Sequence, residues 1–154
     1  MPYYAEGKDC TFSKVERALG LILEALADET SDRKFYKYLM QIAPDQEQQN
    51  IIKLIRDDEI KHFKMFRMIY QEITCQLPIV KQTEECTEST CYCAAIEQAI
   101  FGELKAVELY RKIMFGMCYQ RHRDMLFEII TDELKHSVKW NFLYSKNCSG
   151  CCKE

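Results

Sequence analysis

The chain has 154 residues, 47% of them hydrophobic and 29% charged, which fits one globular domain spanning residues 1–154. Its net charge of −3 and the lack of a basic run argue against nucleic-acid binding. We see no signal peptide at the N-terminus and no apolar run of about 18 residues, so we expect a cytoplasmic protein without a membrane span.

The first half of the chain predicts a helical hairpin. Residues 13–16 (Ser-Lys-Val-Glu) resemble a capping box, and apolar residues follow at helical spacing to about residue 42. Pro44 then interrupts the pattern. Asp45 is suited to cap a second helix, which we expect to run to about Cys75.

The second half predicts another hairpin. Residues 76–90 show no helical period and predict one long connection. A third helix is expected from near residues 90–91 to near residues 116–119, and a fourth over about residues 120–145. Residues 146–154 form a short, Cys-rich tail. Two short connections around one long one predict an all-α antiparallel four-helix bundle, over about residues 13–145, with a crossover between its second and third helices.

The two predicted hairpins repeat each other at an offset of 74 residues (58 to 132) without a gap. Residues 58–62 (Asp-Glu-Ile-Lys-His) match residues 132–136 (Asp-Glu-Leu-Lys-His). Two further polar matches pair Glu29 with Glu103 and Tyr36 with Tyr110. This agreement indicates that the two halves of the bundle carry equivalent functional positions.

A glutamate interrupts the apolar stripe of each predicted helix, and in the second and fourth helices a histidine follows three positions later. Glu29 and Glu59 are equally distant from Pro44, so antiparallel helices that turn there place them level. Glu103 and Glu133 are likewise equidistant from Cys118. We therefore expect one central layer of six side chains: Glu29, Glu59, His62, Glu103, Glu133 and His136.

Such a layer predicts two bound metal ions. An unpaired buried charge costs several kcal/mol or more, whereas two divalent cations neutralise four glutamates. Oxygen-rich sites with one imidazole per metal suit iron or manganese better than structural zinc. We expect two iron ions, with manganese or a mixed pair as alternatives. A metal-free network of buried ion pairs is the other interpretation, for which Arg33 is the one evident cationic partner.

These motifs resemble the ferritin-like superfamily, and within it the rubrerythrin-related diiron-carboxylate proteins, over roughly residues 13–145. The resemblance implies that Glu59 and Glu133 bridge the metals or chelate one each. It implies terminal carboxylates from the first and third helices, and one histidine ligand for each metal.

A histidine ligand usually donates its second N–H to a carboxylate or carbonyl. In this superfamily the aspartate of one half often serves the histidine of the other half. The resemblance therefore implies that Asp132 orients His62 and that Asp58 orients His136.

Three further residues are candidates for supporting roles. Tyr36 and Tyr110 are expected to hydrogen-bond the carboxylates, or else to be core aromatics. Arg33 is expected near the site, where it could help to hold an anionic species, and the repeat has Val107 instead. Ala106 is a departure from the resemblance, because rubrerythrins usually carry a further glutamate at that position.

The chain has nine cysteines, an odd number, and we expect most of them to be free thiols in a reducing compartment. The alternative for residues 91–93 and 148–152 is a zinc site or a redox-active dithiol, and the two segments could meet at one end of the bundle. With one Cys-x-x-Cys, at residues 148–151, a rubredoxin-like domain is not expected. His122 lacks a partnered motif and is expected to be a surface or hairpin residue.

The favoured function is a redox enzyme, an oxidase or peroxidase, in which the dinuclear centre reacts with oxygen or hydrogen peroxide. Its electron donor cannot be read from the sequence. Alternatives are a manganese catalase, an iron-handling protein that oxidises or stores ferrous ions, and a non-enzymatic metal-binding bundle. A homodimer is plausible, whereas nucleic acid and membranes are not expected as partners.

Overall fold

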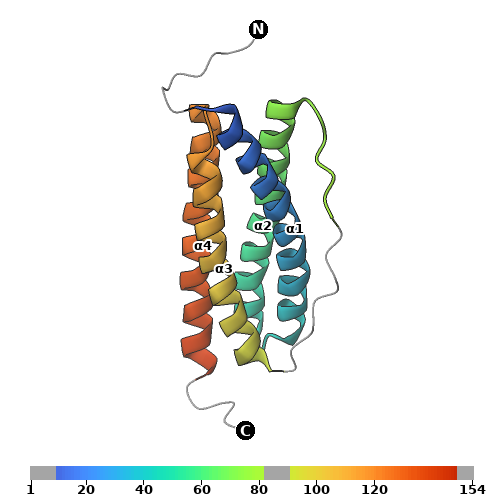
Figure 1. Cartoon of the computed structure of the whole chain (residues 1–154). Coiled ribbons are helices and arrows are strands. Elements are labelled where there is room, and N and C mark those ends of the chain that lie inside the picture. Colours follow the sequence, from blue (N-terminus) through green and yellow to red (C-terminus); the bar gives the residue numbers. More distant parts are fainter. Residues whose placement is uncertain (1–9, 82–90, 149–154) are drawn as a thin grey trace.

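The computed structural model describes residues 10–81 and 91–148, which form an antiparallel four-helix bundle (Figure 1). Its helices are α1 (Phe12–Ile42), α2 (Gln46–Thr74), α3 (Tyr92–Phe115) and α4 (Gln120–Asn147). α1 packs on α2 and α3 on α4, and these hairpins join through contacts of α1 with α3 and of α2 with α4. The predicted all-α bundle is confirmed. Among the described residues, no helix combines the length and apolarity that a bilayer crossing requires.

Polar caps set two of the helix starts. The hydroxyl of Thr11 accepts the backbone N–H of Lys14 at 3.4 Å, so α1 starts before Ser13 and the capping box predicted there is wrong. Asp45 caps α2 as predicted, with Oδ1 2.9 Å from the backbone nitrogen of Gln48. α2 ends where the backbone turns left-handed, at a φ of 58° in Cys75.

The connection between α2 and α3 joins opposite ends of the bundle. α2 ends beside the start of α1, whereas α3 begins at the opposite end, where α1 turns into α2 (Figure 1). The predicted long crossover is therefore confirmed, although residues 82–90 lie outside the described residues. Because of this crossover, α3 is antiparallel to α1 and α4 is antiparallel to α2.

The apolar core is divided into two clusters by a polar layer. One cluster includes Ile22, Leu26, Phe66, Ile69 and Ile129, and the other includes Phe35, Leu39, Ile52, Ile55 and Trp140. A fully buried side chain of this size stabilises the fold by about 1.5–3 kcal/mol. The two clusters together provide the free energy that offsets burial of the polar layer between them.

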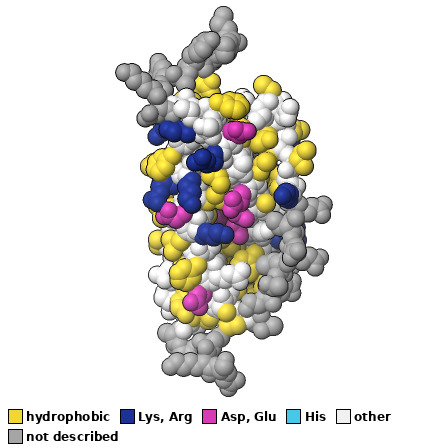
Figure 2. Space-filling model, in the orientation of Figure 1, with side chains coloured by type: hydrophobic (Ala, Val, Ile, Leu, Met, Phe, Trp, Pro, Cys, Tyr) yellow, Lys and Arg dark blue, Asp and Glu magenta, His cyan; other side chains and the backbone are white. Residues whose placement is uncertain are grey.

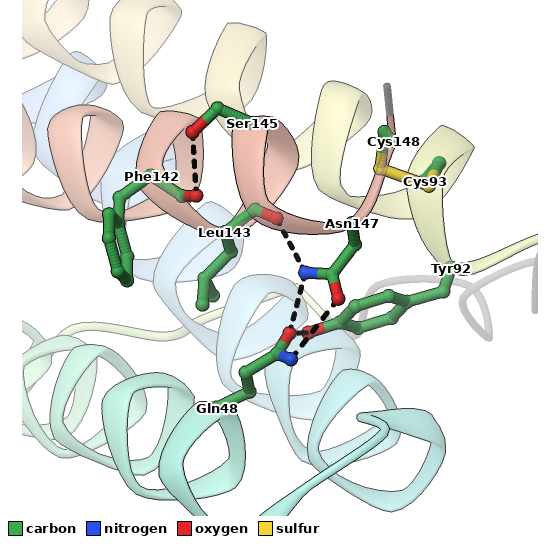
Figure 3. Close-up of a disulfide and its surroundings, with 8 residues drawn as sticks. All are labelled: Gln48, Tyr92, Cys93, Phe142, Leu143, Ser145, Asn147 and Cys148. Atoms are coloured by element: carbon green, nitrogen blue, oxygen red, sulfur yellow. Dashed lines mark hydrogen bonds between the residues drawn. A yellow bond between two sulfur atoms is a disulfide. The ribbon is translucent and has the colours of Figure 1, made fainter. Parts of the chain in front are cut away.

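Among the described residues, two disulfides close the ends of the bundle. Cys10 pairs with Cys118 across a Cα–Cα distance of 5.5 Å, which joins the residues before α1 to the α3–α4 turn. Cys93 pairs with Cys148 across 5.7 Å, which joins the first turn of α3 to the end of α4 (Figure 3). The expectation of mostly free thiols is wrong for these four residues, because partners 55 or 108 residues apart become neighbours only in the folded bundle. Cys86, Cys151 and Cys152 lie outside the described residues.

A hydrogen-bond network beside the second disulfide joins α2 to the other hairpin (Figure 3). Asn147 donates through Nδ2 to Gln48 Oε1 at 2.7 Å, and the Tyr92 hydroxyl donates to the same oxygen at 3.0 Å. Gln48 is almost fully buried, so these bonds satisfy an amide that burial would otherwise leave without partners.

Candidate metal centre

The six side chains of the predicted layer meet at mid-height in the bundle. Each helix contributes a glutamate, and α2 and α4 each add a histidine one turn later. Their relative exposures lie between 0% and 2%, so the whole layer is shielded from water. The residues are Glu29, Glu59, His62, Glu103, Glu133 and His136.

These side chains form two overlapping groups, each with four candidate ligand atoms that lie within 4.8 Å of one another. Glu59 and Glu133 belong to both groups, His62 and Glu29 complete one, and His136 and Glu103 complete the other. The Nδ1 atom of His62 lies 2.9 Å from Glu133 Oε1, and that of His136 lies 3.1 Å from Glu59 Oε1. Each histidine therefore faces the glutamate of the other Glu-x-x-His motif.

Several atoms of this layer are buried and make no hydrogen bond of acceptable geometry among the described residues, although each histidine Nδ1 lies close to a carboxylate oxygen. They are Glu29 Oε2, Glu59 Oε1, Glu133 Oε1, His62 Nδ1 and His136 Nδ1. Buried polar groups are normally satisfied, and a coordinated cation would accept a lone pair from every one of these atoms. Carboxylate oxygens with one imidazole nitrogen per group are donors that suit iron or manganese. The donor set therefore fits two metal ions.

Without metal, the glutamates share protons unequally. Burial, followed by the charge of Glu59, raises the pKa of Glu29 well above 4.5. Burial also raises the pKa of Glu133, with further contributions from Glu59 and Glu103. Burial acts in the same direction on Glu59, but Glu29 and both histidines outweigh it and hold the pKa of Glu59 below its ordinary value. A bound cation would displace the protons from Glu29 and Glu133.

The outer ring nitrogen of each histidine faces an aspartate from the other half of the repeat. His62 Nε2 lies 3.2 Å from Asp132 Oδ2, and His136 Nε2 lies 2.9 Å from Asp58 Oδ2. The structure thus brings together the two pairs that the resemblance implied. A proton on Nε2 leaves the Nδ1 lone pair directed into the layer, which is the tautomer that a metal ligand requires.

The two tyrosines of the repeat also reach across the bundle. The Tyr36 hydroxyl donates to Glu103 Oε1, and the Tyr110 hydroxyl donates to Glu29 Oε1, each at 2.7 Å. Trp140 Nε1 donates to the same oxygen of Glu103 at 2.9 Å, a contact that the sequence analysis missed because Trp140 fits the apolar stripe. The repeat has Phe66 at that position, so the two halves differ in how they hold their glutamates.

The structure shows surroundings for Arg33 and His122 that the sequence did not predict. The guanidinium carbon of Arg33 lies 5.5 Å from the centre of the Phe63 ring, so Arg33 stacks on an aromatic side chain that follows His62 in α2. His122 lies next to the α3–α4 turn as expected, but it is buried rather than on the surface. Its Nε2 atom lies 2.8 Å from Glu72 Oε2, which provides a polar partner at a buried position.

A model of the rubrerythrin family matches residues 21–144, a segment that contains the whole layer. This chain belongs to the rubrerythrin family. A curated relative in this comparison, the uncharacterized protein YhjR of Bacillus subtilis (strain 168), is 30% identical over 121 residues, which cover 79% of this rubrerythrin-family chain and 81% of the relative. The name of that relative carries no function.

Two solved structures share the fold of this rubrerythrin-family chain. A conserved hypothetical protein of Mycobacterium tuberculosis, rv2844, superposes with a TM-score of 0.73 at 14% identity, over 86% of this chain and 92% of the other. A hypothetical protein from Pyrococcus furiosus gives a TM-score of 0.71 at 20% identity, over 85% and 88%. At these identities the likeness shows the fold alone.

Proposed function

We propose that this chain is a dinuclear iron redox protein that reacts with oxygen or hydrogen peroxide. The observation that carries the proposal is the pair of overlapping donor groups, which include buried oxygen and nitrogen atoms that make no hydrogen bond of acceptable geometry among the described residues. Membership of the rubrerythrin family supports iron as the metal. Bound iron would supply the electrons that reduce the oxidant, and an external donor, whose identity the proposal leaves open, would restore them.

The residues of the chain divide this work according to their positions. Glu59 and Glu133 belong to both donor groups, so each would contribute to holding both metals. Glu29 and Glu103 each belong to one group and are assigned as terminal ligands, held by Tyr110 and by Tyr36 with Trp140. His62 and His136 are assigned one metal each. A cytoplasmic location and a homodimer remain predictions.

The deciding experiment measures metal content in protein from iron-supplemented cells, followed by anaerobic reduction and titration with peroxide and oxygen. We expect about two iron ions per chain and many turnovers per centre. Glu59→Ala should abolish both, because it removes a donor from each group. Glu97→Ala is the matched control, since Glu97 is exposed on α3 and should leave both unchanged.

Other outcomes would select other functions. Uptake of many more ions than about two per chain, together with a large shell of subunits, would indicate iron storage. Stoichiometric metal binding without an oxygen reaction would indicate a structural centre. A protein that takes up no transition metal, and whose melting temperature does not change when iron is added, would overturn the dinuclear proposal.

A further inference from the structure

The polar layer is covered on the side of α2 and α4. There His62 and His136 face Asp132 and Asp58, and Lys61 Nζ lies 2.7 Å from Asp132 Oδ2 and 3.7 Å from Asp58 Oδ1. This network of aspartates and lysine lies outside both imidazole rings, so a solute cannot reach the layer from this side without breaking ion pairs.

The side of α1 and α3 is hollowed instead. A cavity of about 140 Å³ lies between these helices, and its lining includes Asp28, Asp32, Gly102, Lys105 and Ala106. A water molecule needs about 10–15 Å³ of such volume, so the cavity has room for several waters or for a small solute. Figure 2 looks onto α1 and α3 and shows acidic side chains near the middle of this face, with basic side chains beside them.

Residues of the cavity lining lie within one helical turn of two of the donors. Asp32 lies one turn after Glu29 on α1, and Ala106 lies one turn after Glu103 on α3. Burial, followed by the charges of Glu59 and Glu103, raises the pKa of Asp32, so in the metal-free chain this side chain favours its protonated form, and an arriving cation would take the place of that proton. The donor nearest in sequence to Asp28 is Glu29, whose Oε2 atom is buried and makes no hydrogen bond among the described residues.

A difference between the two halves of the repeat creates this cavity. At the offset of 74 residues, Asp28 matches Gly102 and Asp32 matches Ala106. α1 therefore contributes two acidic side chains, whereas α3 contributes the space in front of them. A Cβ atom added to Gly102 would meet nothing within 4 Å, which shows how open the lining is at this position.

We propose that this cavity is the passage through which a divalent cation reaches the buried donors, attracted by Asp28 and Asp32 and admitted past Gly102. The inference rests on the proposed function, because it names the route to the same centre. A layer with exposures of 0–2% offers a cation no direct access from the surface, so an opening beside it would speed loading. Acidic side chains on low-dielectric walls raise the local concentration of cations, and Lys105 moderates this effect.

The test measures the rate at which the metal-free full-length chain binds Co²⁺, followed by the visible absorption of the bound ion after rapid mixing. Gly102→Phe should slow binding by about tenfold or more, because the ring would fill the cavity. Asp32→Asn should slow binding by about threefold, and by more as the pH rises, because the amide cannot release a proton to become a carboxylate that attracts the cation. Both variants should still bind as much Co²⁺ at equilibrium as the unmodified chain.

Gly20→Phe is the matched control. Gly20 also lies on a helix with nothing within 4 Å of an added Cβ, but it borders a different cavity, beside Leu23 and Ile79. It should bind Co²⁺ at the unmodified rate. Should Gly102→Phe fail to fold by circular dichroism, the nearly isosteric Asp32→Asn decides the question.

Unmodified binding rates in the variants that fold would overturn the passage and leave the dinuclear centre intact. A chain that binds no Co²⁺ at all would instead overturn the proposed function itself.

Discussion

His62 and Asp132 belong to opposite halves of the repeat, yet Nε2 of the histidine lies 3.2 Å from Oδ2 of the aspartate. Lys61 and Lys135 hold the same aspartate at 2.7 Å and 3.0 Å. Burial raises the pKa of Asp132, but these two lysines and His62 lower it more, so the carboxylate stays ionised at neutral pH. An ionised Asp132 can only accept, which fixes the proton of His62 on Nε2.

Asp132→Asn should weaken metal binding by about 10–100-fold at the site served by His62 and much less at the other. The amide no longer requires a proton on Nε2 and so permits the tautomer that blocks Nδ1. Calorimetric titration with a divalent metal would show this as two separated binding steps. Asp57→Asn is the control, because the ion pairs of Asp57 in the described part of the chain join it to Lys53 and Arg56, away from the histidines. Equal weakening by both variants would contradict the assigned role.

The metal-free chain should lose stability as pH rises above 4.5, the ordinary pKa of glutamate. The pKa values of Glu29 and Glu133 are raised in the folded state, so above this pH the folded chain binds more protons than the unfolded chain. Burial lowers the pKa of His136, but Glu103 and Glu59 outweigh it and raise the value from 6.5 to about 10. The contribution of His136 is therefore complete below pH 6.5 and is lost as pH rises through about 10.

Melting temperatures measured from about pH 5 to about pH 9 would check this, with Glu133→Gln as a variant of weaker pH dependence. A saturating divalent metal should reverse the trend, because metal binding displaces protons and strengthens as pH rises. A metal-free chain that becomes more stable between these limits would contradict the proton sharing described above.

Trp140→Phe makes the two halves of the repeat alike, since Phe66 is the matching residue. The change removes one of two donors to Glu103 Oε1 and leaves the hydroxyl of Tyr36 in place. We expect a loss of about 1–3 kcal/mol in the free energy of unfolding of the metal-free chain, measured with denaturant. Unchanged stability would mean that the indole N–H contributes nothing to holding Glu103.

Cys93→Ser should lower the free energy of unfolding by about 4 kcal/mol in the chain-entropy description of a loop this long. The disulfide with Cys148 closes a separation of 55 residues and restricts the unfolded chain. Denaturant unfolding under non-reducing conditions measures the effect. Cys75→Ser serves as the control, because Cys75 is exposed and free, and it should leave stability unchanged.

Gly116→Ala should destabilise the fold by about 1–3 kcal/mol. A Cβ atom at this position would lie 2.6 Å from the Cβ atom of Ala18, where α1 passes the α3–α4 turn. Gly20→Ala is the comparison, because nothing lies within 4 Å of its added Cβ atom. That variant should gain up to about 1 kcal/mol from helix propensity. Thermal unfolding that ranks the two variants in the opposite order would contradict the close approach.

The sequence by itself predicted the four helices, the long crossover and the set of six residues in the polar layer. Helical periodicity is a local property of the sequence. The gap-free repeat also places polar residues at matching positions of the apolar stripes in both halves. The equal distances of Glu29 and Glu59 from Pro44 then fix their relative heights, since every helical residue advances the chain by the same rise.

Only the tertiary structure decided which side chains face each other between the hairpins. The disulfide partners, the contact of Trp140 with Glu103, the stacking of Arg33 on Phe63 and the cavity beside Asp32 all depend on how each helix is rotated about its axis. Sequence spacing gives the period of a helix but not this rotation, which is set when side chains of four helices pack together.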